Sequence, residues 1–333
     1  MTTKILVTGG SGYIGSNTVK LLLDVGYEVI VCDKNKLPEN LIKSTAQNKN
    51  LQFIDLDLSN SESIDKLMTE QKIDSVIHFA GYIEAGESMR HPEIFFRNNL
   101  VNGLNLLQAM IKHNIKQIIF SSSAAVYKAK EKPLTEEDLT EPANVYGETK
   151  LIFENILKWF DQIYGLKYVS LRYFNAAGAS SGLGENHIPE THLIPILLQS
   201  LLQGSEIKIF GTDYNTPDGT CIRDYIHVQD LAKAHLLSLQ YLSQADSAES
   251  KIYNVGTGAG HSVKEVILAV EQVTGQRVKA VESPRRRGDP PILVADSAKI
   301  KRELNWIPQH NLHSIIQSAW EWHRSCLGIQ TFK

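Results

Sequence analysis

The sequence predicts an α/β fold: a Rossmann-type doubly wound parallel sheet with a smaller mixed α/β domain. Three observations predict it. Short apolar runs alternate with longer amphipathic segments through the first half of the chain, a glycine-rich turn follows the first of these runs, and from about Gly178 the pattern loosens into glycine, proline and polar stretches. Alternating units of this kind indicate a parallel sheet that helices cover on both faces.

The first half of the chain supplies the elements of the sheet. Six apolar runs have the length and composition of strands: Ile5–Thr8, Glu28–Cys32, Gln52–Asp55, Ser75–Phe79, Gln117–Ser121 and Tyr168–Arg172. Four segments between them have helical periodicity: Ile14–Val25, Ser61–Gln71, Phe95–His113 and Tyr146–Ile163.

The second half contains one apolar helix, Leu193–Leu202, which we expect to lie among loops and short elements. Tyr225–Leu239 and Ile252–Val255 are regular again, so this region rejoins the sheet in our prediction. We therefore divide the chain into a first domain over residues 1–177, joined by parts of 220–255, and a second domain over residues 178–333.

Composition excludes several classes of protein. The chain has 333 residues, of which 42% are hydrophobic and 21% charged, as in ordinary globular proteins. A net charge of −3 gives no reason to expect nucleic acid or a membrane as a partner. Three scattered cysteines suggest neither a disulfide framework nor a metal site, and we predict no metal. Without a signal peptide or an apolar stretch of ~20 residues, the chain is expected to be cytoplasmic.

The glycine-rich turn predicts a dinucleotide site. Gly9, Gly12 and Gly15 follow the first strand and precede a helix, with Tyr13 and Ile14 between the last two. Glycines in this context let the backbone approach a pyrophosphate, which the amides at the helix start attract. Asp33 ends the second strand, where a carboxylate accepts hydrogen bonds from ribose hydroxyls and repels a 2′-phosphate. The predicted cofactor is therefore NAD rather than NADP, with the neighbouring Lys34 facing solvent.

Residues after two further strands lie at the same edge of the sheet, where ligands bind in open α/β folds. Asp57 and Leu58 follow the third strand and are placed to meet the adenine, although Asp57 is equally consistent with a solvated loop acid. Phe79, Ala80 and Gly81 end the fourth strand, and small residues there let the backbone pass close to the cofactor.

A catalytic group is predicted at the fifth strand and the helix that follows. Tyr146 and Lys150 are four residues apart, so they share one face of a helix. A cation beside a phenol favours the phenolate, and we expect it to lower the pKa of Tyr146 toward neutrality. Ser121 and Ser123 at the strand end add hydroxyls to this proton relay.

Several motifs in a fixed order make the chain similar, over essentially its whole length, to the extended short-chain dehydrogenase/reductase family, and within it to members that epimerise UDP-sugars at C4. The matching residues are Val7–Ser16, Val76–Gly81, Gly86–Ser88, Ser121–Ser123 with Val126 and Tyr127, Tyr146–Lys150, Leu171–Asn175, Gly219–Val228 and Pro284–Asp289.

The resemblance implies roles for particular residues. Ser123, Tyr146 and Lys150 match the catalytic group, Asn98 and Phe174 match residues beside the nicotinamide and its ribose, and Ser121 and Lys150 join the cofactor set. Asn175, Arg223 and Arg286 match residues that contact the diphosphate of the nucleotide sugar, and Asp289 matches the acid that holds the uridine ribose. The substrate set also includes His192, Leu193, Lys208, Ile209, Phe210 and Leu293. For Ile209 and Phe210, a wall against uracil and simple core filling are both open.

Departures from the family pattern bear on affinity and specificity. Ile83 stands where a lysine near the cofactor phosphates is common, so one phosphate-directed charge is missing. His192 replaces an asparagine that meets the substrate phosphate, which would make that contact sensitive to pH. Leu293 is bulky for the position that lines the 2-substituent of the sugar, and it predicts poor acceptance of N-acetylated sugars.

The implied activity is NAD-dependent 4-epimerisation of a UDP-sugar through a 4-keto intermediate, with UDP-glucose and UDP-galactose as the pair. UDP-xylose and UDP-arabinose are an alternative pair. A 4,6-dehydratase or decarboxylase is a further alternative, but those relatives usually carry an acid in the stretch that Ala124 and Ala125 occupy here. A non-catalytic dinucleotide sensor is another, but such proteins tend to lose the tyrosine or the lysine, and Tyr146 and Lys150 are both present.

The predicted helix Tyr146–Ile163 is apolar around most of its circumference, which indicates burial on more than one side. Together with Phe95–Met110 it predicts a homodimer sealed by two helices from each subunit; a fully internal helix is the alternative.

Overall fold

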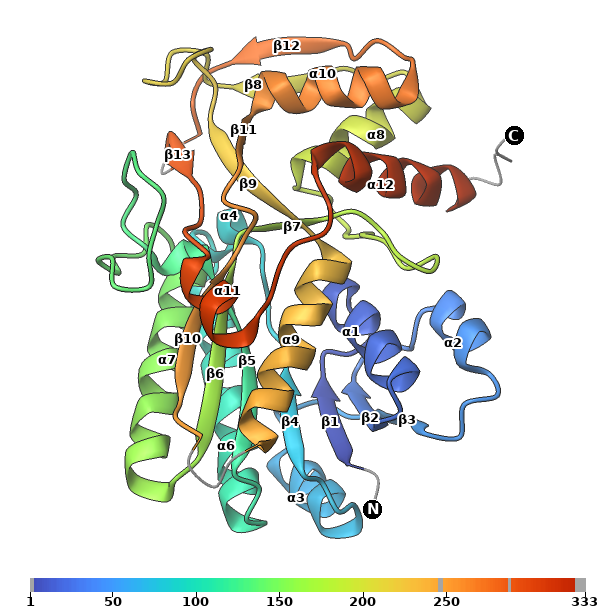
Figure 1. The fold of residues 1–333 in the computed structure, drawn as a ribbon, viewed down its shortest axis with the longest axis vertical. Helices are drawn as coiled ribbons and strands as arrows, with labels where there is room; N and C mark the ends of the chain where they lie inside the picture. Colours follow the sequence, from blue (N-terminus) through green and yellow to red (C-terminus); the bar gives the residue numbers. More distant parts are fainter. Residues whose placement is uncertain (1–2, 245–247, 287–288, 327–333) are drawn as a thin grey trace.

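Seven parallel strands form the main sheet in a computed structural model that describes residues 3–244, 248–286 and 289–326 (Figure 1). Their order across the sheet is β10-β6-β5-β4-β1-β2-β3. The strands are β1 (Lys4–Thr8), β2 (Glu28–Asp33), β3 (Leu51–Asp55), β4 (Ser75–His78), β5 (Gln117–Ser123), β6 (Lys167–Tyr173) and β10 (Lys251–Val255). The predicted fold class and all six predicted strands are therefore confirmed.

The chain reverses its direction across the sheet between β1 and β4. From β1 it runs outward through β2 to β3, then returns to β4 on the other side of β1 and continues to β5 and β6. The loops that follow β1 and β4 consequently leave the sheet on opposite sides and open a crevice at the carboxyl ends of these strands.

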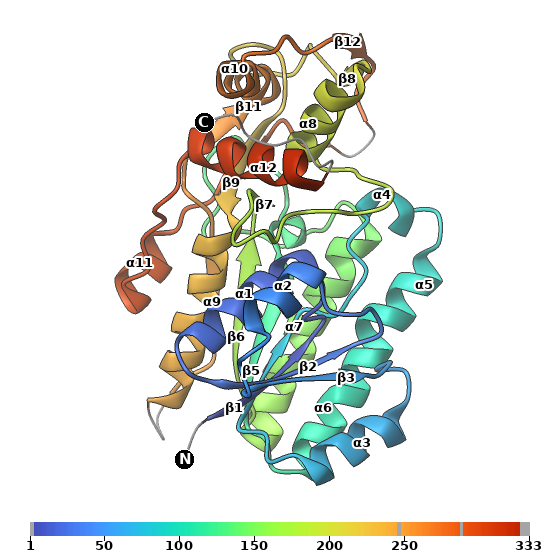
Figure 2. The ribbon, with the colours of Figure 1, turned by 90° about the vertical axis from the view of Figure 1, so that its right-hand side faces the viewer.

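Helices cover both faces of the sheet (Figures 1 and 2). Along β1, Ile5 and Val7 join one apolar core, which includes residues of α1 and α9, whereas Leu6 joins the other, which includes residues of α3, α6 and α7. This alternation is the two-residue period of a strand that is buried on both faces. The helices are α1 (Tyr13–Asp24), α3 (Ser61–Glu70), α6 (Asn102–Lys112), α7 (Val145–Tyr164) and α9 (Val228–Ser243).

The predicted helix Phe95–His113 is a longer and interrupted element. It begins at Pro92, and a π-helical turn, η1 (Arg97–Val101), separates α5 (Pro92–Phe96) from α6. A π turn widens the helix locally and is often found at functional sites. It carries Asn98, which lines the cavity described below, and Asn99, which is buried.

The smaller layer lies beyond the carboxyl ends of the sheet strands (Figure 2). We expected loops and short elements around a single helix there, and this expectation is wrong. Three helices pack around a separate apolar core: α8 (Leu193–Gln203), α10 (Val263–Thr274) and α12 (Leu312–Cys326). Ser262 and Glu265 form a capping box at the start of α10, a signal that is present in the sequence.

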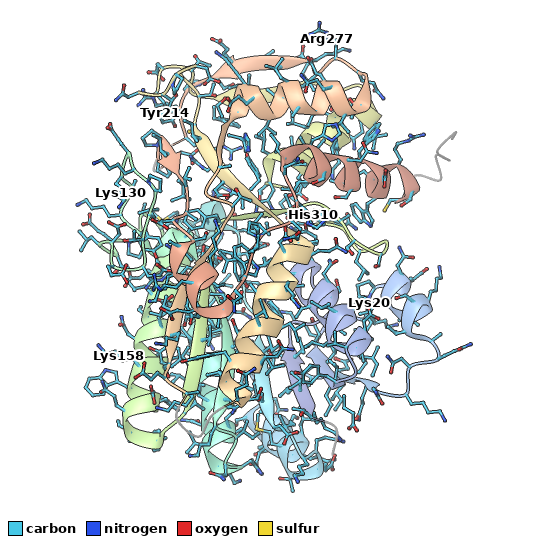
Figure 3. All side chains as sticks on the ribbon, in the orientation of Figure 1. Lys20, Lys130, Lys158, Tyr214, Arg277 and His310 are labelled. Carbon is cyan, nitrogen blue, oxygen red and sulfur yellow. The ribbon has the colours of Figure 1, made fainter. Side chains whose placement is uncertain are left out.

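Short strands and helices complete the architecture. The strands of the smaller layer are β7 (Asn175–Ala177), β8 (Ile207–Phe210), β9 (Ile222–His227), β11 (Gly260–Ser262), β12 (Ala280–Ser283) and β13 (Ile292–Leu293). The remaining helices are α2 (Glu39–Thr45), α4 (Ala85–Ser88), the 3₁₀ turn η2 (Ala124–Val126) and α11 (Ala298–Leu304). In Figure 3, Lys20 and Lys158 lie on α1 and α7, which cover the main sheet, and Tyr214 and Arg277 lie in the smaller layer. Among the described helices, none has the length and apolarity that a membrane span requires.

Candidate active site

A cavity of about 1070 Å³ lies where the carboxyl ends of the main strands face the smaller layer. It contains all of the predicted cofactor residues except Lys150, namely Gly9, Gly12, Tyr13, Ile14, Gly15, Asp33, Asp57, Leu58, Phe79, Ala80, Gly81, Asn98, Ser121, Tyr146 and Phe174. From the predicted substrate set, the lining includes Ser123, Tyr146, Asn175, His192 and Leu293. The fold thus brings together residues that are far apart in the chain.

The glycine-rich turn has the close backbone packing that a dinucleotide cradle requires. Gly9 has φ of +72°, and a Cβ there would lie 2.5 Å from the backbone nitrogen of Ala80. A Cβ on Gly15 would lie 2.3 Å from the carbonyl oxygen of Gly9. No side chain caps the start of α1, and its first residues line the cavity, so their amides are suited to phosphate oxygens. These residues fit a bound NAD.

Asp33 is held at the end of β2 by backbone donors. Its carboxylate accepts hydrogen bonds from the amides of Ser11 (3.0 Å) and Asn35 (2.9 Å), so it is fixed beside the glycine turn. Lys34 is exposed as expected, but its ammonium lies 3.3 Å from the Tyr82 hydroxyl and the residue lines the cavity. Asp57 combines both roles considered for it: the Ser59 amide caps its carboxylate and lowers its pKa, and it also lines the cavity.

The predicted catalytic residues converge at one end of the cavity. Ser123 ends β5, and Tyr146 is the second residue of α7, whose start is capped by the Asn144 side chain. The amide of Tyr146 donates a hydrogen bond to the Ser88 hydroxyl (3.1 Å). Lys150 is buried one turn further along, and its ammonium donates to the Ser121 carbonyl (2.7 Å). Its Nζ lies 5.8 Å from the centre of the Tyr146 ring.

Burial reverses the expected effect on the Tyr146 phenol. Desolvation raises its pKa, the hydrogen bond with Ser123 lowers it in part, and the charge of Glu84 raises it further. Burial also lowers the pKa of Lys150 to about 8, against a smaller opposing effect of Glu154. The prediction that Lys150 lowers the pKa of Tyr146 toward neutrality is therefore wrong for these residues by themselves. The reason is that burial penalises both charges.

A buried polar network around Glu154, on the helix that carries Lys150, was not predicted. The Arg172 guanidinium donates to both carboxylate oxygens of Glu154, at 2.9 and 2.6 Å, and the Ser122 hydroxyl donates to one of them at 2.6 Å. Glu154 lies one helical turn after Lys150 and is buried with Arg172. An acid on an otherwise apolar helix face was the available signal, because a buried carboxylate needs a partner.

Asn99 is a second positioning residue that sequence reasoning missed. From the π turn it accepts a hydrogen bond from the Tyr82 amide (2.8 Å) and donates to the Thr149 hydroxyl (3.0 Å). A Cβ on Gly81 would lie 3.2 Å from its side-chain oxygen. Asn99 therefore ties the end of β4 to the helix that carries Tyr146 and Lys150.

The remaining predicted substrate residues belong to the smaller layer and lie outside the lining of this cavity. Arg223 on β9 pairs with Asp289 at 2.7 Å, and the register places Arg223 beside Leu293 of the cavity wall. The Arg286 guanidinium lies 3.9 Å from the centre of the Phe210 ring. Lys208 is exposed, Leu193 is half-buried at the start of α8, and Ile209 is buried in the apolar core. Residues 287 and 288 of the predicted motif lie outside the described residues.

Two departures from the family pattern have defined surroundings. Ile83 lines the cavity, and its amide donates to Glu84 (3.1 Å). The His192 Nδ1 lies 2.6 Å from a carboxylate oxygen of Glu185. Although burial favours the neutral ring, Glu185 and Glu190 raise the pKa of His192 to about 10. The expected pH sensitivity near neutrality is therefore absent, because the imidazole stays protonated across that range.

Comparisons with known proteins agree with this geometry. Residues 5–256 match the model of the NAD dependent epimerase/dehydratase family. A curated "UDP-glucose 4-epimerase" of Halalkalibacterium halodurans is 47% identical, over 96% of this chain and 95% of that protein.

Two solved structures are also similar. The "UDP-glucose 4-epimerase from Bifidobacterium longum in complex with NAD+ and UDP" is 40% identical, with a TM-score of 0.91 over 98% of this chain and 100% of that one. The Stenotrophomonas maltophila enzyme "with bound NAD and formylated UDP-arabinopyranose" is 37% identical, with a TM-score of 0.92 over 98% and 99%. The chain therefore belongs to the NAD dependent epimerase/dehydratase family.

Proposed function

We propose that this protein catalyses the NAD-dependent 4-epimerisation of a UDP-sugar, with UDP-glucose and UDP-galactose as its substrate pair. The observation that carries the proposal is the position of Ser123 and Tyr146 at the end of the cavity that the glycine turn also lines. Relatives of similar length named for this activity, one of them 47% identical, support the same reaction.

In this mechanism Tyr146 accepts the proton of the sugar 4-hydroxyl. Ser123 forms a hydrogen bond with the same sugar oxygen and helps to transfer the proton to the Tyr146 phenol. When bound, NAD would supply the hydride acceptor for oxidation at C4 and, once reduced, the hydride donor for reduction of the 4-keto sugar. Lys150 is the residue that holds the nicotinamide ribose. Its ammonium is held in place by the hydrogen bond that it donates to the Ser121 carbonyl at 2.7 Å.

The UDP end stays anchored in this proposal while the sugar turns over. Arg223 and Arg286 hold the diphosphate, since planar guanidinium groups match phosphate oxygens, and Asp289 holds the uridine ribose. Arg223 on β9 is paired with Leu293 on the adjacent β13, which supports a continuous site from the smaller layer into the cavity. Leu293 limits the space at the 2-substituent of the sugar.

The decisive experiment offers UDP-glucose, UDP-xylose and UDP-N-acetylglucosamine separately to the purified protein without added cofactor. We expect UDP-glucose to be converted to UDP-galactose, because NAD is retained, and UDP-N-acetylglucosamine to react more slowly. No inversion at C4 of any of the three, with or without added NAD, would refute the proposal. Faster inversion of UDP-xylose would favour the pentose pair. We include this substrate because a similar structure holds a UDP-arabinopyranose derivative.

We further propose a homodimer built on α5, η1 and α7, which pack together on one side of the sheet (Figure 2). Large apolar side chains are exposed there: Ile94, Val101, Trp159, Ile163 and Tyr164. Large apolar side chains exposed on neighbouring helices are typical of an interface. We also propose a reducing, cytoplasmic setting, which the free buried thiols of Cys32 and Cys221 support.

A further inference from the structure

Four metal-ligating side chains gather in the segment that leads into α8. Glu185, His187, Glu190 and His192 each offer one ligand atom, and these atoms all lie within 4.8 Å of one another. We call them the 185–192 cluster. Three of its residues, Glu185, His187 and His192, also line the cavity wall. None of the four was predicted to bind a metal ion, because the expectation of no metal considered cysteines alone.

The buried carboxylates of the cluster have unused acceptor oxygens. The side chains of Glu185 and Glu190 are only 5% and 6% exposed. In each, Oε1 is occupied: that of Glu185 faces His192 Nδ1 at 2.6 Å, and that of Glu190 accepts the amides of Thr191 and His192. In each, Oε2 is buried without a hydrogen-bond partner. Two such oxygens in one place are costly unless something binds them.

His187 is also incompletely used. Its Nδ1 lies 3.1 Å from Glu185 Oε1, but the two are not aligned as a hydrogen bond and the nitrogen is buried without a partner. An imidazole nitrogen that carries no proton can bind a metal ion. The cluster therefore contains three possible metal-ligand atoms without a hydrogen-bond partner: two carboxylate oxygens and one imidazole nitrogen. The fourth ligand comes from the His192 ring.

We propose that the 185–192 cluster binds one divalent transition-metal ion of the Zn²⁺ type. Two imidazoles and two carboxylates form a four-coordinate set that suits Zn²⁺ better than Mg²⁺ or Ca²⁺, which prefer oxygen ligands. The charges also balance, because the ion displaces the proton that His192 carries and the two carboxylates then neutralise the dication. Ligand bonds of about 2.0–2.2 Å require the four side chains to draw closer together on binding.

The position of the cluster indicates what the ion does. The residues just before it are held from both layers: the Tyr13 hydroxyl donates to the Gly178 carbonyl (2.6 Å), and the Trp322 indole donates to the Gly182 carbonyl (3.1 Å). Tyr13 is the first residue of α1, directly after the glycine turn, and Trp322 belongs to α12. An ion at the cluster fixes this segment against the cofactor end of the cavity and is a structural ion, not a reactant.

The test is metal binding, which does not depend on whether the proposed reaction is correct. The full-length protein is stripped with a chelator, dialysed against Zn²⁺ and analysed for metal content. We expect one Zn²⁺ per chain. Glu185→Gln and His187→Gln each remove one ligand and should weaken Zn²⁺ binding tenfold or more. His91→Gln is the matched control, because His91 lies near Glu87 and Glu93 in an exposed cluster, and it should bind as the wild type does.

A second measurement covers variants that fail to fold. Co²⁺ added to the stripped wild-type protein should give the intense visible bands of a four-coordinate site that contains nitrogen and oxygen ligands, and Zn²⁺ should abolish them by competition. A folded Glu185→Gln protein that binds Zn²⁺ with unchanged affinity would overturn the site. So would a wild-type protein that binds neither ion, or binds Co²⁺ only with the weak spectrum of six-coordination.

Discussion

Tyr146 is the residue on which the proposed chemistry depends most. Tyr146→Phe removes the phenol but keeps the ring, and we expect kcat to fall by ~10²-fold or more, as is typical when a positioned acid–base group is lost. The measurement is the initial rate of UDP-glucose epimerisation. Tyr241→Phe is the control, because its exposed hydroxyl binds the Glu249 carbonyl far from the cavity. Near-normal turnover of Tyr146→Phe would exclude the phenol as the base.

Asp33 should determine the choice between NAD and NADP. Asp33→Asn removes the charge that repels a 2′-phosphate, and the exposed Lys34 ammonium beside it then favours that phosphate. We expect weaker NAD binding and a smaller preference over NADP, measured by titration of the nucleotide-free protein. Asp55→Asn, an exposed acid at the end of the adjacent β3, is the control. An unchanged preference in Asp33→Asn would contradict the ribose contact.

Lys150 should give stability a distinct dependence on pH. Its pKa is about 8 in the folded protein and near 10.5 when unfolded, so folding penalises the charged form. This penalty is complete below pH 8 and fades as pH rises from 8 to 10.5. Relative to Lys150→Met, the wild-type free energy of unfolding should therefore rise by roughly 3 kcal/mol over that window. A difference that is flat with pH in denaturant titrations would refute it.

The sequence predicted the catalytic and cofactor residues at the cavity because their motifs are local: a turn after a strand, or two residues one helical turn apart. It did not predict the pKa of Tyr146, since that depends on how deeply the assembled protein buries the phenol. Nor did it predict the pairing of Glu154 with Arg172, because the two residues meet only when α7 packs on β6.

At the scale of elements, the turn between β1 and α1 has a sharp steric requirement. Gly15→Ala places a methyl group 2.3 Å from the Gly9 carbonyl, so α1 must shift. We expect a loss of about 1–3 kcal/mol in stability and weaker NAD retention. Gly86→Ala is the matched control, because nothing lies within 4 Å of the added Cβ. The stability of this variant should stay within about ±0.5 kcal/mol of the wild type. Thermal unfolding and bound-NAD content measure both; equal behaviour of the two variants would contradict the packing argument.

The prediction of helices and strands succeeded where the spacing of apolar residues and the turn residues at the ends of a segment indicate the same element. The strands of the main sheet are short β-branched runs between turns, and each appeared within one or two residues of its predicted bounds. The helices α10 and α12 were missed for a different reason. Each packs a few apolar residues, such as Val266 and Val270, against other helices of the smaller layer. Those contacts form only in the folded protein, so the sequence does not reveal them.

For the whole molecule, the proposed dimer makes a direct prediction. Trp159→Glu with Val101→Glu places two charges in the exposed apolar surface of α7 and η1, where the side chains are 62% and 52% exposed. We expect sedimentation to show a dimer for the wild type and a folded monomer for this variant. Ile307→Glu, at a 64% exposed position away from that surface, should remain dimeric. A wild type that sediments as a monomer would exclude the interface.

The pairing of β10 with β6 has a consequence for how the chain is made. Val169 on β6 lies opposite Lys251 on β10, although the whole of β7, α8, β8, β9 and α9 comes between them in the sequence. A nascent chain that has emerged only to residue 177 therefore carries β6 as a bare sheet edge, open to pairing with other chains. Synthesis must proceed past residue 255 before that edge is covered, so cutting the gene at the apparent domain border should yield an aggregating fragment.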